Sequence, residues 1–124
     1  IGIDTTNIRE IRRYLRSDTL SDAFIRHTFT QAERESAKER PHLEEYFATR
    51  FAAKEAVFKA IAHLLPDKIF DLRIVETLSH DDGSPFISPN AELRALLKLA
   101  EVDTLHISIT TQDDFATAFV IAEG

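Results

Sequence analysis

The chain has 124 residues, 44% of them hydrophobic and 29% charged, which predicts one globular domain with a core of its own. Its net charge of −6 argues against a general nucleic-acid binder, and no apolar run is long enough to span a membrane. The absence of cysteine excludes disulfides and thiolate chemistry, and it agrees with a reducing, cytoplasmic setting.

The first segment, Ile1 to Asp4, is predicted to be a short buried strand that ends in a carboxylate. Taken alone, Asp4 is typical of a turn or a helix cap. Residues 7–16 then predict an amphipathic helix. Its outer face carries four arginines, Arg9, Arg12, Arg13 and Arg16. Such a basic patch on an acidic protein is either a solvated face or a docking surface for an acidic partner.

Three further helices follow. One is predicted over Leu20 to Thr28, and a second runs from a capping box at Thr30 and Glu33 to about residue 38. The longest helical pattern comes next, with Pro41 in its first turn and a proline at position 66 after its end. Its predicted buried stripe consists of large apolar residues at helical spacing: Leu43, Phe47, Phe51, Phe58, Ile61 and Leu65.

The last third of the chain is mainly strand-like. Residues 69–78 read as extended, 79–83 as a turn, and 86–87 as a short returning strand. A helix that starts at Ser88 and Pro89 precedes an alternating strand at 105–110, a turn at 111–114 and a strand at 115–122. This last strand is apolar on both faces, which is typical of a central or an interface strand. The order predicts an α+β domain with an antiparallel sheet packed against a long helix.

Within the long helix, Glu55 and Lys59 lie one turn apart and share a face with Ala48 and Ala52. The spacing alone is also that of an ordinary exposed ion pair, worth about 0.3–0.5 kcal/mol. Here, however, the two charges stand on a surface of small side chains beside the core. Another group can therefore approach them closely.

Residues 50–59, Arg-Phe-Ala-Ala-Lys-Glu-Ala-Val-Phe-Lys, resemble the signature of the phosphopantetheinyl transferases, and most closely that of the small holo-acyl-carrier-protein synthases. The opening apolar-Gly-apolar-Asp of residues 1–4 resembles another motif of that family. The resemblance covers nearly the whole chain. It implies a phosphopantetheinyl transferase-like fold, a homotrimer with sites at subunit contacts, and no nucleic-acid or membrane partner. The implied reaction, in fatty-acid and lipid metabolism, moves the phosphopantetheine arm of coenzyme A to a serine of an apo acyl carrier protein.

The residues can be matched to this chemistry. The pyrophosphate of coenzyme A is densely negative and needs a cation, and Mg²⁺ usually binds one or two carboxylates plus substrate phosphates. Asp4 and Glu55 can supply the carboxylates, and Lys59 can neutralise the attacked phosphate or the departing adenosine bisphosphate. Glu55, or water held between it and the metal, is the candidate base. The carrier protein brings its own nucleophile.

By matching position, the resemblance implies further contacts. The residues implied at coenzyme A are Glu45, Arg50, Lys59, Pro85 and Thr111. Arg50 suits a phosphate because guanidinium matches its geometry, and Pro85 falls in a Gly-x-Pro turn that lies near the nucleotide in the family. The carrier protein is implied to dock on the arginines of the first helix, and this surface continues over Phe24 and Arg26.

Two segments depart from the family pattern. The residues after Lys59, Ala60 to Leu65, contain none of the usual glycines, and Thr111 stands where the family has a histidine that contacts coenzyme A. These changes predict weaker coenzyme A binding or an unusual branch. Two alternatives to a free transferase therefore remain open. One is a weak or inactive homologue that only binds carrier protein, and the other is a transferase domain of a larger synthase.

Overall fold

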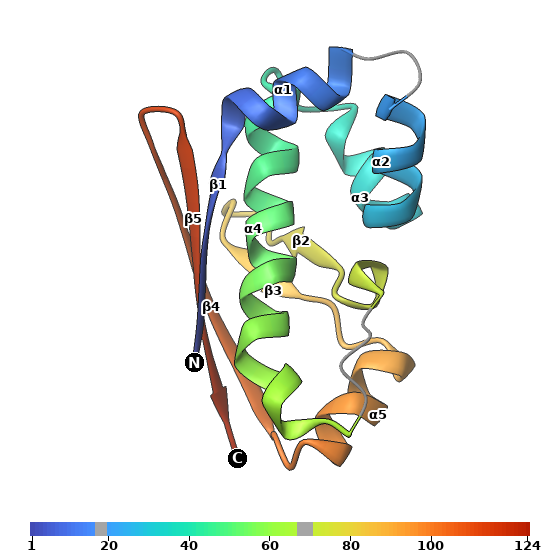
Figure 1. Cartoon of the computed structure of the whole chain (residues 1–124), viewed down its shortest axis with the longest axis vertical. Coiled ribbons are helices and arrows are strands. Elements are labelled where there is room, and N and C mark those ends of the chain that lie inside the picture. The colour runs from blue at the N-terminus through green and yellow to red at the C-terminus, as the bar shows by residue number, and fades with distance from the viewer. Residues whose placement is uncertain (17–19, 67–70) are drawn as a thin grey trace.

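The computed structural model of the chain describes residues 1–16, 20–66 and 71–124. In them a three-stranded antiparallel sheet packs on one side of a long helix, and shorter elements lie on the other side (Figure 1). The elements are β1 (Gly2–Asn7), α1 (Ile8–Arg16), α2 (Leu20–Thr28), α3 (Gln31–Ala37), α4 (Leu43–Ile61), β2 (Thr77–Ser79), β3 (Pro85–Ile87), α5 (Ala91–Leu99), β4 (Thr104–Gln112) and β5 (Phe115–Glu123). This arrangement confirms the predicted α+β fold.

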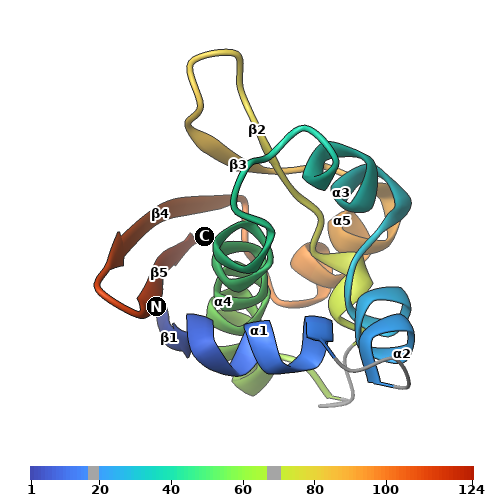
Figure 2. The same cartoon turned by 90° about the horizontal axis from the view of Figure 1, so that it is seen from above.

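The long helix α4 is the centre of the molecule. Figure 2 shows it end-on, with the sheet on one side, α3 and α5 on the other, and the β2–β3 hairpin reaching past it toward β4. The predicted buried stripe is wrong at its start: Leu43, the first residue of α4, is 44% exposed. The alanines expected on an open surface, Ala48 and Ala52, are instead fully buried. The group that approaches this surface is the protein's own sheet, since α4 packs mainly against β1 and β5.

Strand β1 lies unusually close to α4, and Gly2 is the reason. A Cβ atom at this position would lie 1.9 Å from the carbonyl oxygen of Ala56 and 2.8 Å from the backbone nitrogen of Ala60. The strand is longer than predicted and is not fully buried, because alternate residues lie on the outer face of the sheet. Ile1 and Ile3 are 76% and 56% exposed.

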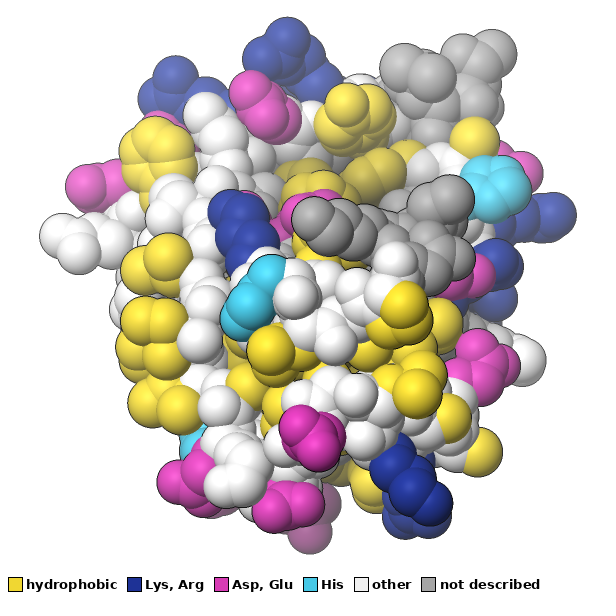
Figure 3. Space-filling view, turned by 60° about the horizontal axis from the view of Figure 1, so that its bottom comes forward, with side chains coloured by type: hydrophobic (Ala, Val, Ile, Leu, Met, Phe, Trp, Pro, Cys, Tyr) yellow, Lys and Arg dark blue, Asp and Glu magenta, His cyan; other side chains and the backbone are white. Residues whose placement is uncertain are grey.

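Strand β5 lies between β1 and β4, which confirms the prediction of a central strand. Ala116, Ala118 and Val120 are fully buried on its inner face. Its outer face stays exposed and, together with β1, carries an apolar group that we call the outer sheet face: Ile3, Phe115, Phe119 and Ile121. Figure 3 shows apolar side chains gathered along the side of the molecule where the sheet lies.

The helices at 7–16, 20–28 and 30–38 are found within about one residue of their predicted bounds, and the capping box of α3 is present. Four other boundaries were predicted wrongly. Pro41 precedes α4, because the cap of that helix is His42. Residues 72–74 form a 3-10 turn capped by Asp71, not a strand, and residues 69–70 of that prediction lie outside the described residues. Helix α5 starts only after its cap, Asn90. Strand β4 runs on to Gln112, so the turn before β5 is shorter than predicted.

In the part of the chain that the structure describes, no helix has both the length and the apolar character that crossing a bilayer requires.

Candidate active site

Strand β1 brings Asp4 against α4, beside Lys59. The Lys59 Nζ atom donates to Asp4 Oδ1 at 3.1 Å and to the backbone carbonyl of Ile3 at 3.1 Å. Thr6 Oγ1 donates to the other oxygen of Asp4 at 2.9 Å. The close packing permitted by Gly2 therefore places the strand's carboxylate next to the helix residues that the sequence singled out.

Glu55 lies half-buried within reach of the same two charges. Burial raises the pKa of Glu55, the negative charge of Asp4 raises it further, and Lys59 opposes both effects. A carboxyl whose pKa is raised accepts a proton closer to neutral pH, as a general base must. The two neighbouring carboxylates also make the site attractive to a cation.

The donor set at this point fits magnesium. Asp4 and Glu55 offer carboxylate oxygens, and among the described residues no three acidic, histidine or cysteine side chains gather around one point. A cation held by two carboxylates must take its other oxygens from water or from substrate phosphates, which is the usual arrangement for Mg²⁺. A structural zinc site would instead need four nitrogen or sulfur ligands.

Four of the five residues implied at coenzyme A meet at a second place, nearer the start of α4. Glu45, Arg50, Pro85 and Thr111 line one hollow of about 180 Å³ between α4, the β2–β3 hairpin and the end of β4. Thr111 Oγ1 donates to Glu45 Oε1 at 3.2 Å. The fifth residue, Lys59, does not line this hollow and lies with Asp4.

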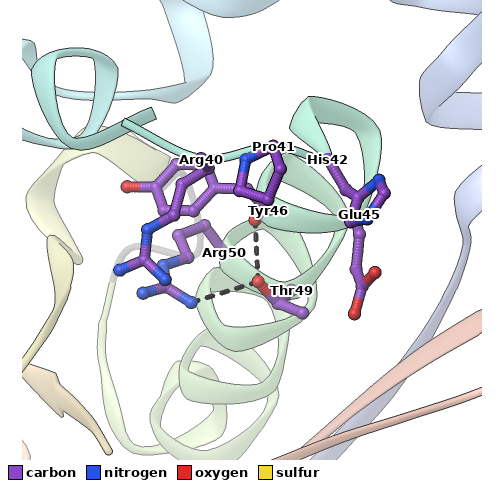
Figure 4. A pocket seen from close by; sticks show the side chains of 7 residues that line it. All are labelled: Arg40, Pro41, His42, Glu45, Tyr46, Thr49 and Arg50. Carbon is purple, nitrogen blue, oxygen red and sulfur yellow. Dashed lines mark hydrogen bonds between the residues drawn. The ribbon is translucent and has the colours of Figure 1, made fainter. Parts of the chain in front are cut away.

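An adjoining hollow of about 250 Å³ contains two guanidinium groups, those of Arg40 and Arg50, which we call the arginine pair (Figure 4). Their Cζ atoms lie 5.4 Å and 4.6 Å from the centre of the Tyr46 ring. Both groups donate to Ser79 Oγ on β2, Arg40 at 3.3 Å. The full lining is Arg40, Pro41, His42, Glu45, Tyr46, Thr49 and Arg50.

The arginine pair is short of negative charge. Within residues 1–16, 20–66 and 71–124, neither guanidinium forms an ion pair with a carboxylate. Arg50 is 7% exposed, and its buried Nε has no hydrogen-bond partner among the described atoms. Burial, and then the charge of Arg40, lower the pKa of Arg50. An anion that entered this hollow would supply the missing charge.

Sequence reasoning identified Arg50 but missed Arg40, Tyr46 and Ser79. These three residues are brought to Arg50 by the loop before α4, by α4 itself and by β2. The only local signal was the position of Arg40 directly before Pro41, at the start of the long helix.

Four of the arginines expected to bind a partner lie on α1. Two of them already contact acidic groups of the protein: Arg9 Nη2 lies 2.7 Å from Asp114 Oδ2, and Arg12 Nη2 lies 3.4 Å from Glu44 Oε1. The other two, Arg13 and Arg16, are exposed to solvent.

The predicted continuation of this surface on α2 is present in part. The ring of Phe24 stacks on that of Tyr14, with 4.9 Å between centroids, and so joins α2 to α1. Arg26 pairs with Asp22 on its own helix at 3.0 Å. Phe24 therefore contributes to packing as well as to the surface.

The chain is similar to known proteins in both sequence and fold. A family model described as the 4'-phosphopantetheinyl transferase superfamily matches residues 1–120. The chain is 34% identical over 128 residues to the holo-[acyl-carrier-protein] synthase of Methylobacterium sp. (strain 4-46), with 100% of the chain and 93% of the relative covered. It is 33% identical over 125 residues to the synthase of Trichlorobacter lovleyi, covering 100% and 96%.

Solved structures agree with these similarities. The holo-[acyl-carrier-protein] synthase of Neisseria meningitidis superposes with a TM-score of 0.86 at 25% identity, covering 99% of this chain and 96% of that one. The synthase of Bacillus anthracis str. Ames, in complex with CoA (3',5'-ADP), superposes with a TM-score of 0.74 at 31% identity, covering 98% and 93%. A complex of the Chronobacterium ammoniagenes protein with CoA gives 0.80 at 25% identity, covering 98% and 94%.

Proposed function

We propose, because the chain belongs to the 4'-phosphopantetheinyl transferase superfamily, that it transfers the phosphopantetheine arm of coenzyme A to a serine of an apo acyl carrier protein. The products are holo carrier protein and adenosine bisphosphate. The observation that carries this proposal is the meeting of Asp4, Glu55 and Lys59 at the contact of β1 with α4. The cysteine-free composition agrees with a reaction in the cytoplasm.

The reaction replaces the phosphoanhydride bond of the pyrophosphate by a phosphate ester bond to serine. The serine oxygen bonds to the phosphorus that carries the pantetheine arm, and the bond from that phosphorus to the adenosine phosphate breaks. Glu55 takes the serine proton, because a raised pKa makes its carboxylate a stronger base than an ordinary one. Lys59 neutralises the charge that grows on the departing adenosine bisphosphate. Mg²⁺, held by Asp4 and Glu55, would neutralise the pyrophosphate.

We assign the hollows beside α4 to coenzyme A. The arginine pair, Arg40 and Arg50, is suited to one of its phosphates because guanidinium groups bind phosphate oxygens in a fixed fork. Glu45, Pro85 and Thr111 form the neighbouring wall. At this wall Thr111 offers a hydroxyl where the family has a histidine ring. In the adjoining hollow, Arg40 adds a positive charge that the sequence did not predict.

We assign the carrier protein to the exposed end of α1. Arg13 and Arg16 project from it without an acidic neighbour among the described ion pairs, whereas Arg9 and Arg12 have one. Basic groups of this kind steer an acidic partner to its site. Phe24 and Arg26 extend the surface onto α2.

We also propose a homotrimer. The outer sheet face leaves Phe115, Phe119 and Ile121 47%, 39% and 40% exposed, with Ile3 opposite Phe119 on β1. Contiguous exposed apolar side chains usually mark a contact with another protein. Copies of the chain that meet through this face would cover it.

One assay tests the proposed transfer. The protein is incubated with coenzyme A, Mg²⁺ and apo carrier protein, and the carrier protein is weighed by mass spectrometry. We expect the mass of one phosphopantetheine group to be added, and a far slower addition with the Glu55→Gln variant. If the wild type binds carrier protein but adds nothing, the protein is a binding module and the transferase proposal fails.

A further inference from the structure

A buried ion pair joins Glu33 of α3 to Lys54 of α4, and the transfer proposed above gives it no role. Both side chains are fully buried, and Lys54 Nζ lies 2.7 Å from Glu33 Oε1. Lys54 Nζ also donates to the carbonyls of Leu72, at 3.1 Å, and Val75, at 2.6 Å. The ammonium group thus has three acceptors inside the protein and cannot touch a substrate.

The Glu33 carboxylate is occupied to the same degree. Its Oε1 accepts from the backbone nitrogen of Thr30 at 2.9 Å as well as from Lys54, and its Oε2 accepts from the backbone nitrogen of Thr77 at 3.0 Å. Its backbone carbonyl accepts from Tyr46 Oη at 2.9 Å. One residue therefore links the start of α3, the start of β2 and a tyrosine of α4.

Two of these links lead to the arginine pair. Thr77 lies two residues before Ser79, whose Oγ accepts from both guanidinium groups. Tyr46 presents the ring beside which both guanidinium groups lie. By fixing Thr77 and Tyr46, Glu33 fixes both supports of the arginine pair.

Stability alone gives no reason for a buried ion pair at this place. Removing two charges from water is costly, and apolar pairs of similar volume are often as stable or more stable. The best-attested use of such a pair is to select one arrangement of the elements around it.

We propose that Glu33 and Lys54 are positioning residues for coenzyme A binding. They hold α3 and β2 against α4, so that Ser79 and the Tyr46 ring keep the arginine pair facing a phosphate of the substrate. This inference rests on the proposed function. It concerns affinity for coenzyme A and leaves the chemistry at Glu55 untouched.

The double variant Glu33→Leu/Lys54→Met tests it, because it removes the pair without leaving a buried charge unpaired. We expect a folded protein whose Kd and KM for coenzyme A rise about tenfold or more, comparable to losing one hydrogen bond to a charged group. The kcat and the KM for carrier protein should not change. The exposed pair at the end of α3, Glu35 and Lys38, is the matched control when replaced by Gln and Met. A folded double variant with wild-type affinity for coenzyme A would overturn the proposal.

Ser79→Ala tests the link between β2 and the arginine pair. It can overturn the proposal even if the double variant does not fold. It removes the acceptor shared by the arginine pair and leaves the buried pair intact, so the Kd for coenzyme A should rise while the Tm stays constant. An unchanged Kd would show that the route is not used. Added to the double variant, Ser79→Ala should have little further effect, because all three residues act on the same arginines.

Calorimetry on the wild type separates the two proposals. Wild-type protein that does not bind coenzyme A in the presence of Mg²⁺ contradicts the proposed function, and with it the positioning role. Normal binding by the wild type together with normal binding by the variants contradicts the positioning role alone.

Discussion

Gly2→Ala should damage catalysis although its side chain never meets a substrate. The added methyl group would lie 1.9 Å from the carbonyl oxygen of Ala56, and Cβ atoms essentially never come closer than 3.0 Å to such an atom. The strand must therefore withdraw from α4 by about 1.1 Å. That shift carries Asp4 away from Lys59 and Glu55.

The expected size follows from this displacement. A misplacement of about 1 Å in catalytic geometry can lower turnover about 10²-fold. Overpacking of a well-filled contact typically costs about 1–3 kcal/mol, which corresponds to roughly 4–12 °C in Tm for a domain of this size. The backbone contact cannot be relieved by a side-chain rotation, because the obstructing atoms belong to the helix backbone.

The measurement is kcat for phosphopantetheine transfer at saturating coenzyme A and carrier protein, with Tm from circular dichroism. Thr5→Ala is the control, since it shortens an exposed side chain of the same strand and should retain wild-type kcat. If Gly2→Ala kept wild-type kcat and Tm, the close contact of β1 with α4 would not be what places Asp4, and the reasoning would be refuted.

Four other predictions concern the same surfaces. Glu55→Gln should lower turnover about 10²-fold or more, which a transfer assay measures. It should also raise Tm at neutral pH but not in acid, because the folded protein loses stability when a carboxyl with a raised folded-state pKa ionises. Melting curves at two pH values check this. The residual activity of Asp4→Asn should have its acid limb at lower pH than the wild type, since the lost charge had raised the pKa of Glu55; a pH profile of kcat/KM decides this. Arg13→Glu with Arg16→Glu should raise the KM for carrier protein but not for coenzyme A, and the wild-type KM for carrier protein should rise with salt. Phe119→Asp should yield monomers by light scattering, and a monomeric wild type would contradict the trimer.

Features encoded locally were predictable from the sequence. The capping box of α3 depends on two residues three positions apart. Helices α2 and α3, which lie before and after its first residue, were found near their predicted bounds. Glu55 and Lys59 are one turn apart in one helix, so their proximity follows from helix geometry alone. Asp4 could be assigned to the same site only because residues 1–4 resemble a second motif of the family whose signature contains Glu55 and Lys59.

Features that depend on distant contacts were not predictable. The sequence showed Glu33 as a capping residue. Its pairing with Lys54 joins two helices through residues 21 positions apart, and no local sequence pattern predicts it. Arg40 meets Ser79 across 39 positions for the same reason. The buried stripe of α4 was misjudged at Leu43, the first residue of the helix, because periodicity does not show where along a helix its packed neighbours begin.

The two lysines of the signature show how one helix separates structure from chemistry. Lys54 and Lys59 are five residues apart, so about 140° of rotation divides them, and they project to nearly opposite sides of α4. On one side Lys54 is wholly buried and its ammonium group donates to three acceptors of the protein, so it is not available to a substrate. On the other side Lys59 is 52% exposed beside Asp4, so its charge is available to a phosphate. The close approach of β1 is possible only because small residues meet at the contact, with Gly2 of β1 against the backbone of Ala56 and Ala60. The signature therefore specifies a buried anchor, a contact of small residues and an exposed charge within ten residues, and the last two place Asp4 beside Lys59.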